Sequence, residues 1–175
     1  YGDITDYDSL RAALSGMSKL FGVFHCAAQS HPPTGFVDPL GTLKTNLIGS
    51  ANLFHACPKS TKICVVSTSE VYGNSGSDGR LLKETDPLAP SNPYATGKAA
   101  MDLHFQERVK NGFNTGFITR AFSHTGPRRG KTFSISSDAY QLAGVIVERN
   151  KLAERGIASP KGFTLKVGNL ETVRC

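Results

Sequence analysis

The chain has 175 residues, enough to bury one sizeable core, and this length fits one domain or one domain with part of another. Its 39% apolar and 19% charged residues exclude a disordered chain, and no apolar run approaches the ~20 residues of a membrane-spanning helix. The net charge of +6 allows an acidic or phosphorylated partner, but the basic group at 128–131 lacks the interleaved aromatic residues of single-strand binders, so we expect no nucleic acid.

The first half of the chain alternates helical and strand patterns. Apolar residues recur at three- and four-residue steps over residues 6–20, which predicts a helix. The short apolar run 23–28 predicts a strand that is covered on both faces in a parallel sheet. After a polar loop at 29–39, residues 40–56 again have helical spacing, and residues 62–67 (KICVVS) predict a second buried strand.

The second half continues this alternation. A long loop with four prolines spans 73–93, and residues 94–110 then predict a helix that ends at an Asn-Gly pair. Residues 115–121 predict a third strand, 134–150 a helix, and 163–167 a further short strand. Such alternation requires right-handed crossovers, so the predicted fold class is α/β with a mostly parallel sheet.

The cysteines and several other polar residues are predicted to be structural. Neither a CxxC pair nor zinc-ligand spacing is present, which predicts reduced thiols in the core and no metal site. The cysteines are Cys26, Cys57, Cys64 and Cys175. His25 is interpreted as a core histidine, and Asp38 and Asn46 as helix-surface or capping residues. The first residues lack the pattern of a secretory signal, so we expect a cytoplasmic protein.

Polar segments directly follow three of the predicted strands. They are residues 28–31, 67–70 and 122–129. Ligands of parallel sheets bind outside the carboxyl ends of the strands. We therefore expect the polar chemistry to gather along one edge of the sheet.

Tyr94 and Lys98 open the helix predicted at 94–110. A phenol with an unperturbed pKa of roughly 10 is a poor base near neutral pH, but an ammonium one helical turn away favours the phenolate and can reach a ribose hydroxyl. Thr68, after a neighbouring strand, is placed to hydrogen-bond a substrate oxygen, and Glu70 supplies a separate carboxyl acid or base. A Tyr-x-x-x-Lys match arises by chance in roughly one such chain in three, so a solvated helix face is the alternative.

Several short motifs occur in a fixed order along the whole chain. They are residues 1–6 (YGDITD), 27–31 (AAQSH), 67–73 (STSEVYG), 92–94 (NPY) with Lys98, 122–124 (FSH), 127–130 (PRRG) and 168–170 (GNL). In these motifs the chain resembles the extended short-chain dehydrogenase/reductase family, and within it most closely the GDP-mannose 4,6-dehydratases among the nucleotide-sugar dehydratases.

The resemblance implies a partial Rossmann-like, doubly wound parallel sheet. Residues 1–125 would form the C-terminal part of a dinucleotide-binding domain. Residues 126–175 would begin the substrate-binding region, with a possible return strand at 163–167. The missing part of the fold is the N-terminal Gly-rich βαβ unit.

The resemblance also implies NADP or NAD as cofactor, a nucleotide sugar as substrate, and a role for each matching residue. Asp3 and Ile4 would flank the adenine, and the cofactor's ribose and phosphate path would be lined by Ala27, Ala28 and Gln29. Tyr94 and Lys98 would hold the nicotinamide ribose, and His124 would lie near the nicotinamide. Arg129 would approach cofactor phosphate, and the substrate would meet Ser69, Ser123 and Arg128.

The implied reaction uses Thr68, Glu70, Tyr94 and Lys98 as catalytic residues. Tyr94 takes the proton of the sugar 4-hydroxyl as a hydride leaves carbon 4. The 4-keto group then acidifies carbon 5, so that Glu70 can remove the carbon-5 proton and help expel the 6-hydroxyl as water. A reductase or epimerase of the same family needs the tyrosine and lysine but no carboxylate for elimination, so Glu70 favours the dehydratase.

The sequence departs from the family pattern in three places. The Gly-rich turn that binds pyrophosphate is absent, so we expect this chain alone to bind dinucleotide weakly or not at all, and the residue that selects NAD or NADP belongs to the same missing part. Ser123 stands where asparagine is common, and Arg174-Cys175 replaces an Arg-Asp pair. A sheet without its first strands would leave an apolar edge, which predicts association with another copy.

Two further interpretations stay open at this stage. One is a nucleotide-sugar reductase or epimerase of the same family. The other, from a different class, is a non-catalytic truncated remnant that serves as a binding module.

Overall fold

The computed structural model describes residues 2–17 and 20–167. The chain divides into two compact units, with the division between Phe122 and Ser123.

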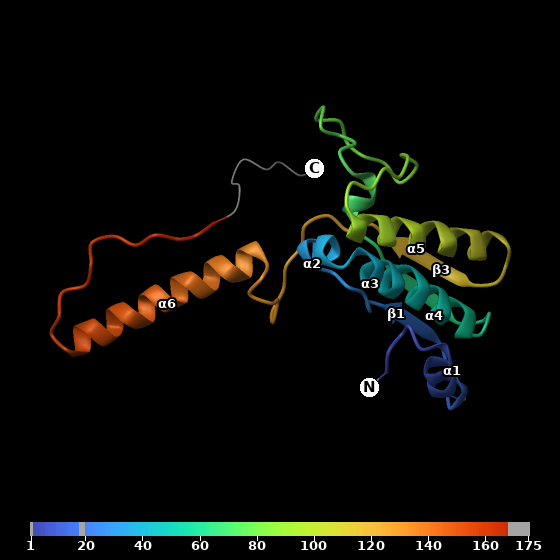
Figure 1. Cartoon of the computed structure of the whole chain (residues 1–175), viewed down its shortest axis with the longest axis horizontal. Coiled ribbons are helices and arrows are strands. Elements are labelled where there is room, and N and C mark those ends of the chain that lie inside the picture. The colour runs from blue at the N-terminus through green and yellow to red at the C-terminus, as the bar shows by residue number, and fades with distance from the viewer. Residues whose placement is uncertain (1, 18–19, 168–175) are drawn as a thin grey trace. The chain divides into compact units, whose positions relative to one another are not determined.

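The first unit is an α/β unit in which helices and parallel strands alternate (Figure 1). Its sheet has the order β1-β2-β3, and both pairs of neighbours are parallel, as predicted. In chain order its elements are α1 (Tyr7–Ser15), β1 (Gly22–His25), α2 (Pro32–Val37), α3 (Pro39–Leu43), the π-helical turn η1 (Lys44–Gly49), α4 (Ser50–Ala56), β2 (Lys62–Val66), the 3-10 turn η2 (Ser69–Tyr72), α5 (Pro93–Lys110) and β3 (Thr115–Thr119).

The apolar core lies between the sheet and the helices α4 and α5, which run side by side on one face of it (Figure 1). Alternate residues of β2 point into this core, because successive side chains of a strand face opposite ways. The central members are Leu53, Phe54, Ile63, Val65, Met101 and Phe105. Burying a side chain of this size stabilises the fold by about 1.5–3 kcal/mol.

The opposite face of the sheet is open within the first unit. Phe24, Cys64 and Phe117 are direct register partners on β1, β2 and β3. Phe24 is 80% exposed and Phe117 is 61% exposed. The prediction that the first strand is covered on both faces is therefore wrong for this unit, because its helices pack on one face.

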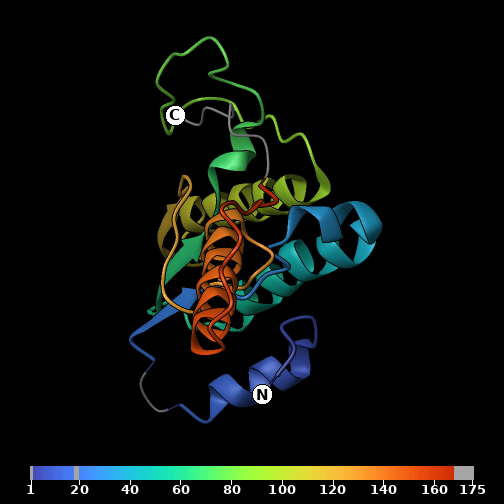
Figure 2. The same ribbon diagram turned by 90° about the vertical axis from the view of Figure 1, so that its left-hand side faces the viewer.

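Local sequence signals explain where α5 begins and ends. Asn92 is the N-cap, Pro93 occupies the first helical position, and the missing N–H of proline costs nothing there. Asn111 closes the helix, and Gly112 follows with a φ of 71°, a left-handed conformation that suits glycine. The loop 73–92, which precedes α5, projects away from the sheet in both views (Figures 1 and 2).

Several predicted boundaries differ from the structure. The first helix ends at Ser15, and α2 lies inside the segment predicted to be a loop. Residues 163–167 form no strand, because they pair with no neighbouring strand among the described residues, so that prediction is wrong. The second unit contains α6 (Ser134–Glu154), four residues longer than predicted. No helix in the described ranges combines the length and apolar character needed to cross a membrane.

Candidate active site

Lys98 is buried at the carboxyl end of β2. The residue is only 3% exposed, and its Nζ donates to the carbonyl oxygen of Val66 at 2.7 Å. Burial lowers the pKa of Lys98 to about 8, an effect that the nearby Cys26 opposes. Tyr94 is also buried and lies one turn earlier in α5. The Lys98 ammonium thus lies at the end of the central strand, and both Tyr94 and Lys98 are buried rather than on a solvated helix face.

Glu70 is joined to the first turn of α5 by the side chain of Asn92. The Thr68 hydroxyl accepts the Glu70 N–H at 3.3 Å and so caps η2, the turn that carries Glu70. The Asn92 Nδ2 donates to the Glu70 Oε2 at 3.0 Å, while the Asn92 Oδ1 accepts the N–H of Ala95 at 2.8 Å. The Asn92 amide therefore links Glu70, on η2, to the first turn of α5, which carries Tyr94.

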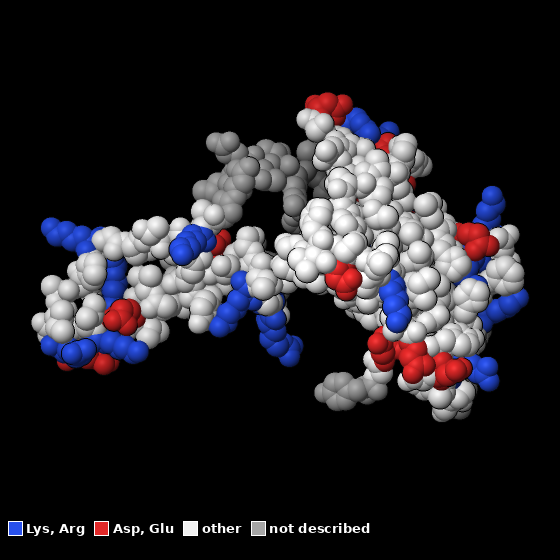
Figure 3. Space-filling view, viewed as in Figure 1, with Lys and Arg blue, Asp and Glu red and all other residues white. Residues whose placement is uncertain are grey.

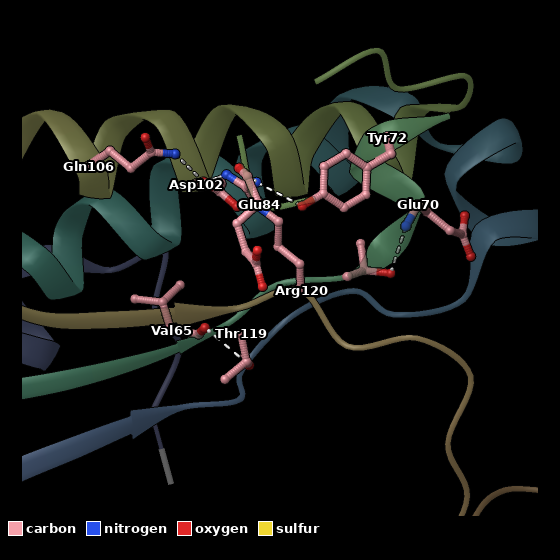
Figure 4. Close-up of polar contacts among 9 residues, drawn as sticks. Val65, Glu70, Tyr72, Glu84, Asp102, Gln106, Thr119 and Arg120 are labelled. Atoms are coloured by element: carbon pink, nitrogen blue, oxygen red, sulfur yellow. Dashed lines mark hydrogen bonds and ion pairs between the residues drawn. The ribbon is translucent and has the colours of Figure 1, made fainter. Parts of the chain in front are cut away.

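A buried ion pair between Arg120 and Asp102 contacts Tyr72, the last residue of η2 (Figure 4). Arg120 donates to both oxygens of Asp102, from Nε at 2.8 Å and from Nη2 at 3.0 Å. The Arg120 Nη1 also donates to the Tyr72 hydroxyl at 2.9 Å. The hydrogen bonds to Asp102 raise the pKa of Arg120, which stays charged. In Figure 4 the Tyr72 hydroxyl points toward this pair, whereas the Glu70 carboxylate points away from it.

Two hydrogen bonds connect the segment after β1 to the π-helical turn η1, between the backbone of Gln29 and the side chain of Asn46. The Gln29 N–H donates to the Asn46 Oδ1 at 2.8 Å, and the Asn46 Nδ2 donates to the Gln29 carbonyl at 3.0 Å. Asn46 is 0% exposed, so its interpretation as a surface or capping residue is wrong, whereas Asp38 does cap α3. Asn46 lies in the π-helical turn η1, a feature that is frequent at functional sites. Its burial against α5 was not foreseen, because its partner is 17 residues away in sequence.

The other predicted cofactor residues of the first unit have simpler surroundings. Asp3 is exposed, and its Oδ1 accepts the Thr5 N–H at 2.8 Å, a bond that lowers the pKa of Asp3. Ile4 lies against Gly49, where a Cβ would sit 2.6 Å from the Ile4 Cγ1. Ala27 is exposed and Ala28 is half-buried. None of these contacts tests a role toward a cofactor, so the roles stay predictions.

Of the remaining predicted residues, Ser69 lies in η2, where its N–H donates to the Ala121 carbonyl at 3.0 Å, and the others fall outside the first unit. Ser123, His124 and Arg128 are exposed in the second unit, and Arg129 lies over the Phe133 ring at 3.8 Å. Their predicted roles stay predictions. The Gly-Asn-Leu motif at 168–170 and the pair Arg174-Cys175 lie outside the described residues.

The cysteine and histidine predictions are partly confirmed. Cys57 is buried and Cys64 is half-buried, and both are free, but Cys26 is exposed and is wrong as a core thiol. Burial raises the pKa of the Cys57 thiol to about 11, so this thiol is unreactive. His25 is a satisfied core histidine, with Nε2 at 2.7 Å from the Ser50 hydroxyl. Over the described ranges, no three His, Cys, Asp or Glu side chains gather as a metal site would require.

The first unit fits one part of a dinucleotide. An ammonium has three N–H donors, and among the described residues Val66 is the acceptor that the Lys98 Nζ reaches. Two donors are left for ligand hydroxyls such as those of a ribose. The buried Ser67 hydroxyl, which directly follows β2, has no hydrogen-bond partner within the described ranges. The donor set therefore suits the sugar end of a nicotinamide cofactor.

Comparisons with known proteins agree with this arrangement. The family model described as GDP-mannose 4,6 dehydratase matches residues 1–174. The chain is 33% identical over 153 residues to a GDP-mannose 4,6-dehydratase of Vibrio cholerae, covering 83% of this chain and 40% of that protein. It is 35% identical over 125 residues to a GDP-6-deoxy-D-mannose reductase of Pseudomonas aeruginosa, covering 69% of this chain and 41% of that protein. The chain thus spans less than half the length of these two relatives.

A solved structure extends the similarity to the fold. The structure of RMD from Pseudomonas aeruginosa, complexed with NADPH, superposes with a TM-score of 0.74 at 28% identity. The match covers 91% of this chain and 51% of that one. The predicted Rossmann-like α/β fold is confirmed.

Proposed function

The chain belongs to the GDP-mannose 4,6 dehydratase family, and we propose that it forms part of a nucleotide-sugar 4,6-dehydratase that uses NADP or NAD. The observation that carries this proposal is the connection of Glu70 to the first turn of α5 through Asn92. It joins a carboxylate to the turn that bears Tyr94. A dehydratase needs both groups, because it must remove protons from oxygen and from carbon.

The residues of the first unit have distinct tasks in this reaction. Tyr94 takes the proton of the 4-hydroxyl, and the buried Lys98 ammonium favours the phenolate that this step requires. Thr68 hydrogen-bonds the substrate oxygen. Glu70 then removes the carbon-5 proton and delivers a proton to the departing 6-hydroxyl, which leaves as water. When bound, NADP or NAD would supply the hydride acceptor for carbon 4 and the hydride donor for carbon 6.

The second unit would supply phosphate recognition. Ser123 and Arg128 are proposed to meet the nucleotide sugar together with Ser69, and His124 and Arg129 the cofactor. Arginine forks suit phosphate oxygens, and the positive charge of this unit favours a diphosphate ligand. In the first unit, Asp3, Ile4, Ala27, Ala28 and Gln29 would line the path of the adenosine half of the cofactor.

Substitution of the proposed base tests this function. In the longest natural protein that contains this chain, Tyr94→Phe should lower turnover of GDP-mannose at least ~100-fold while substrate binding is kept, because general-base catalysis contributes about 10²–10⁴-fold. Isothermal titration of the same natural protein with NADP⁺, NAD⁺ and GDP-mannose measures binding separately. Full activity of Tyr94→Phe would reject the assignment, and no saturable heat for any ligand would favour the binding-module alternative.

A reductase of the same family is the second candidate, because the chain is 35% identical to a GDP-6-deoxy-D-mannose reductase over 125 residues. Glu70→Gln separates the two. A dehydratase should lose water elimination but still exchange hydride at carbon 4, whereas a reductase should be little affected. The isotope content of carbon 4 and the amount of 6-deoxy product give the two readouts.

Association and location are further parts of the proposal. We expect a homo-oligomer, because the exposed Phe24 and Phe117 leave an apolar sheet face. Size-exclusion chromatography at micromolar concentration checks this, and a clean monomer would contradict it. A cytoplasmic location, where nucleotide sugars and NADP are available to an enzyme of this kind, is proposed with it.

A further inference from the structure

Asn92 contacts the carboxylate to which the proposed reaction assigns elimination. Its Oδ1 accepts the N–H of Ala95 at 2.8 Å, which is the N-cap bond of α5. Its Nδ2 donates to the Glu70 Oε2 at 3.0 Å. The sequence identifies Asn92 as a helix-opening residue, but the structure gives the same side chain a second partner.

An amide is suited to both contacts, because its oxygen accepts while its nitrogen donates. Serine and aspartate cap helices about as well as asparagine, so capping alone does not require an amide. Aspartate has no donor for Glu70, and the serine hydroxyl is too short to replace the amide nitrogen while it caps Ala95. The Glu70 contact therefore distinguishes asparagine from the other capping residues.

The backbone on each side of this contact is fixed by other bonds. Glu70 lies in η2, where the Thr68 hydroxyl accepts its N–H and its carbonyl accepts the N–H of Gly73 at 3.0 Å. The neighbouring Tyr72 is tied to Arg120. The freedom that is left to Glu70 is in its side-chain torsions, and the Asn92 amide restricts these. Orientation of this kind lowers the barrier of a proton transfer.

We propose that Asn92 is a positioning residue for Glu70: its amide holds the carboxylate beside the turn that carries Tyr94, oriented to take the carbon-5 proton. The reaction step in this inference rests on the proposed function. The contact between the two side chains can be tested without turnover.

Two variants separate positioning from helix capping. Asn92→Ser and Asn92→Asp both keep a capping oxygen, so the urea midpoint of unfolding should fall much less in either than in Asn92→Ala. In the longest natural protein that contains this chain, Asn92→Ser should lower water elimination roughly tenfold or more, since a hydrogen bond to a charged group is lost. Asn92→Asp should lower it further, to about 100-fold, because two carboxylates then repel each other. Hydride exchange at carbon 4 should change less than threefold in both.

The inference is decided by whether water elimination falls more than hydride exchange at carbon 4. Elimination that is unchanged in both variants would overturn it, and so would equal losses in elimination, carbon-4 exchange and stability, since that is the signature of a purely structural cap. Asn92→Ala, which loses both contacts, should add a drop in the urea midpoint to the loss of elimination.

A readout without substrate keeps this test distinct from that of the proposed function. In ¹⁵N-labelled 175-residue chain, the Asn92 side-chain N–H that donates to Glu70 should exchange slowly with water, and Glu70→Ala should raise its exchange rate at least tenfold. An unchanged rate would overturn the positioning role. Failure of the proposed function appears elsewhere, as Glu70→Gln leaving water elimination intact.

Discussion

The two units of the chain differ in how they use their side chains. The first unit buries an apolar core and also buries charged residues such as Lys98 and Asp102, both of which have hydrogen-bond partners. In the second unit, the 21 residues of α6 include no buried one. Lys98 is therefore fixed by contacts within its own unit, whereas Ser123 and Arg128 of the second unit lie at exposed positions.

The units also differ in charge. From Ser123 onward the sequence has nine Lys and Arg against four Asp and Glu, while the preceding residues have eleven against ten. Figure 3 shows basic side chains spread over the second unit. Several of them lie against aromatic rings, as Lys131 does at 3.5 Å from the centre of the Tyr140 ring. The residues proposed for proton transfer thus lie in the nearly neutral unit, and the arginines proposed for phosphate binding lie in the basic one.

The largest expected effect is on the buried ion pair of the first unit. Asp102→Ala should lower the free energy of unfolding by about 3–5 kcal/mol, because Arg120 keeps its charge without its carboxylate partner. Arg155→Ala, which removes an exposed arginine at the end of α6 in the second unit, is the matched control and should change stability by less than about 0.5 kcal/mol. Urea unfolding followed by circular dichroism measures both. Equal losses of unfolding free energy in the two variants would contradict the claim that charged residues are buried and paired in the first unit only.

An intermediate effect is expected on lowering the pH, because His25 is 2% exposed. Burial, aided by the charge of Lys98, lowers the pKa of His25 to about 4. The unfolded chain binds a proton below about pH 6.5, but the folded one does so near pH 4, so stability should fall as the pH drops through this window. The total loss should be on the order of 3 kcal/mol.

The pH dependence has its control in the second unit. His25→Gln should remove most of the slope between pH 6.5 and pH 4.5, above the range in which most carboxylates titrate. Asn150→Gln, at an exposed position of α6 and without a titratable group, should leave the slope as in the unaltered chain. Urea midpoints at half-unit steps of pH measure the slopes. A slope that survives His25→Gln would show that another group causes it.

Sequence patterns predicted the elements whose signals are local. The strand Lys62–Val66 and the helix Pro93–Lys110 were found from β-branched residues, helical spacing and capping residues. Tyr94 and Lys98, the predicted active-site pair, are both buried, and their chemical role stays a prediction. Helix α2 was missed, because six residues that begin with two prolines show no periodicity.

What sequence could not show depends on contacts between distant residues. The alternation of Phe163, Leu165 and Val167 is typical of a strand, but a strand also needs a neighbour to pair with. Asn46 reads as a polar residue on a helix, and its burial depends on Gln29 and on the close approach of Gly97. The hydrogen bond from Asn92 to Glu70 crosses 22 residues, so the capping pattern that identifies Asn92 does not reveal it.

The smallest effect comes from one substitution made in each unit. Gly144→Ala in α6 should stabilise its helix by about 0.5–1 kcal/mol, since a Cβ there meets nothing within 4 Å and alanine has the higher helix propensity. Gly97→Ala in α5 places a Cβ 3.0 Å from the Cβ of Asn46, a residue held by two hydrogen bonds to Gln29. Overpacking costs about 1–3 kcal/mol, which exceeds the gain in propensity, so this variant should be less stable by about 1 kcal/mol. Opposite signs in urea unfolding would show that the unit carrying Lys98 is closely packed while the helix of the basic unit is not, and two gains of equal size would refute it.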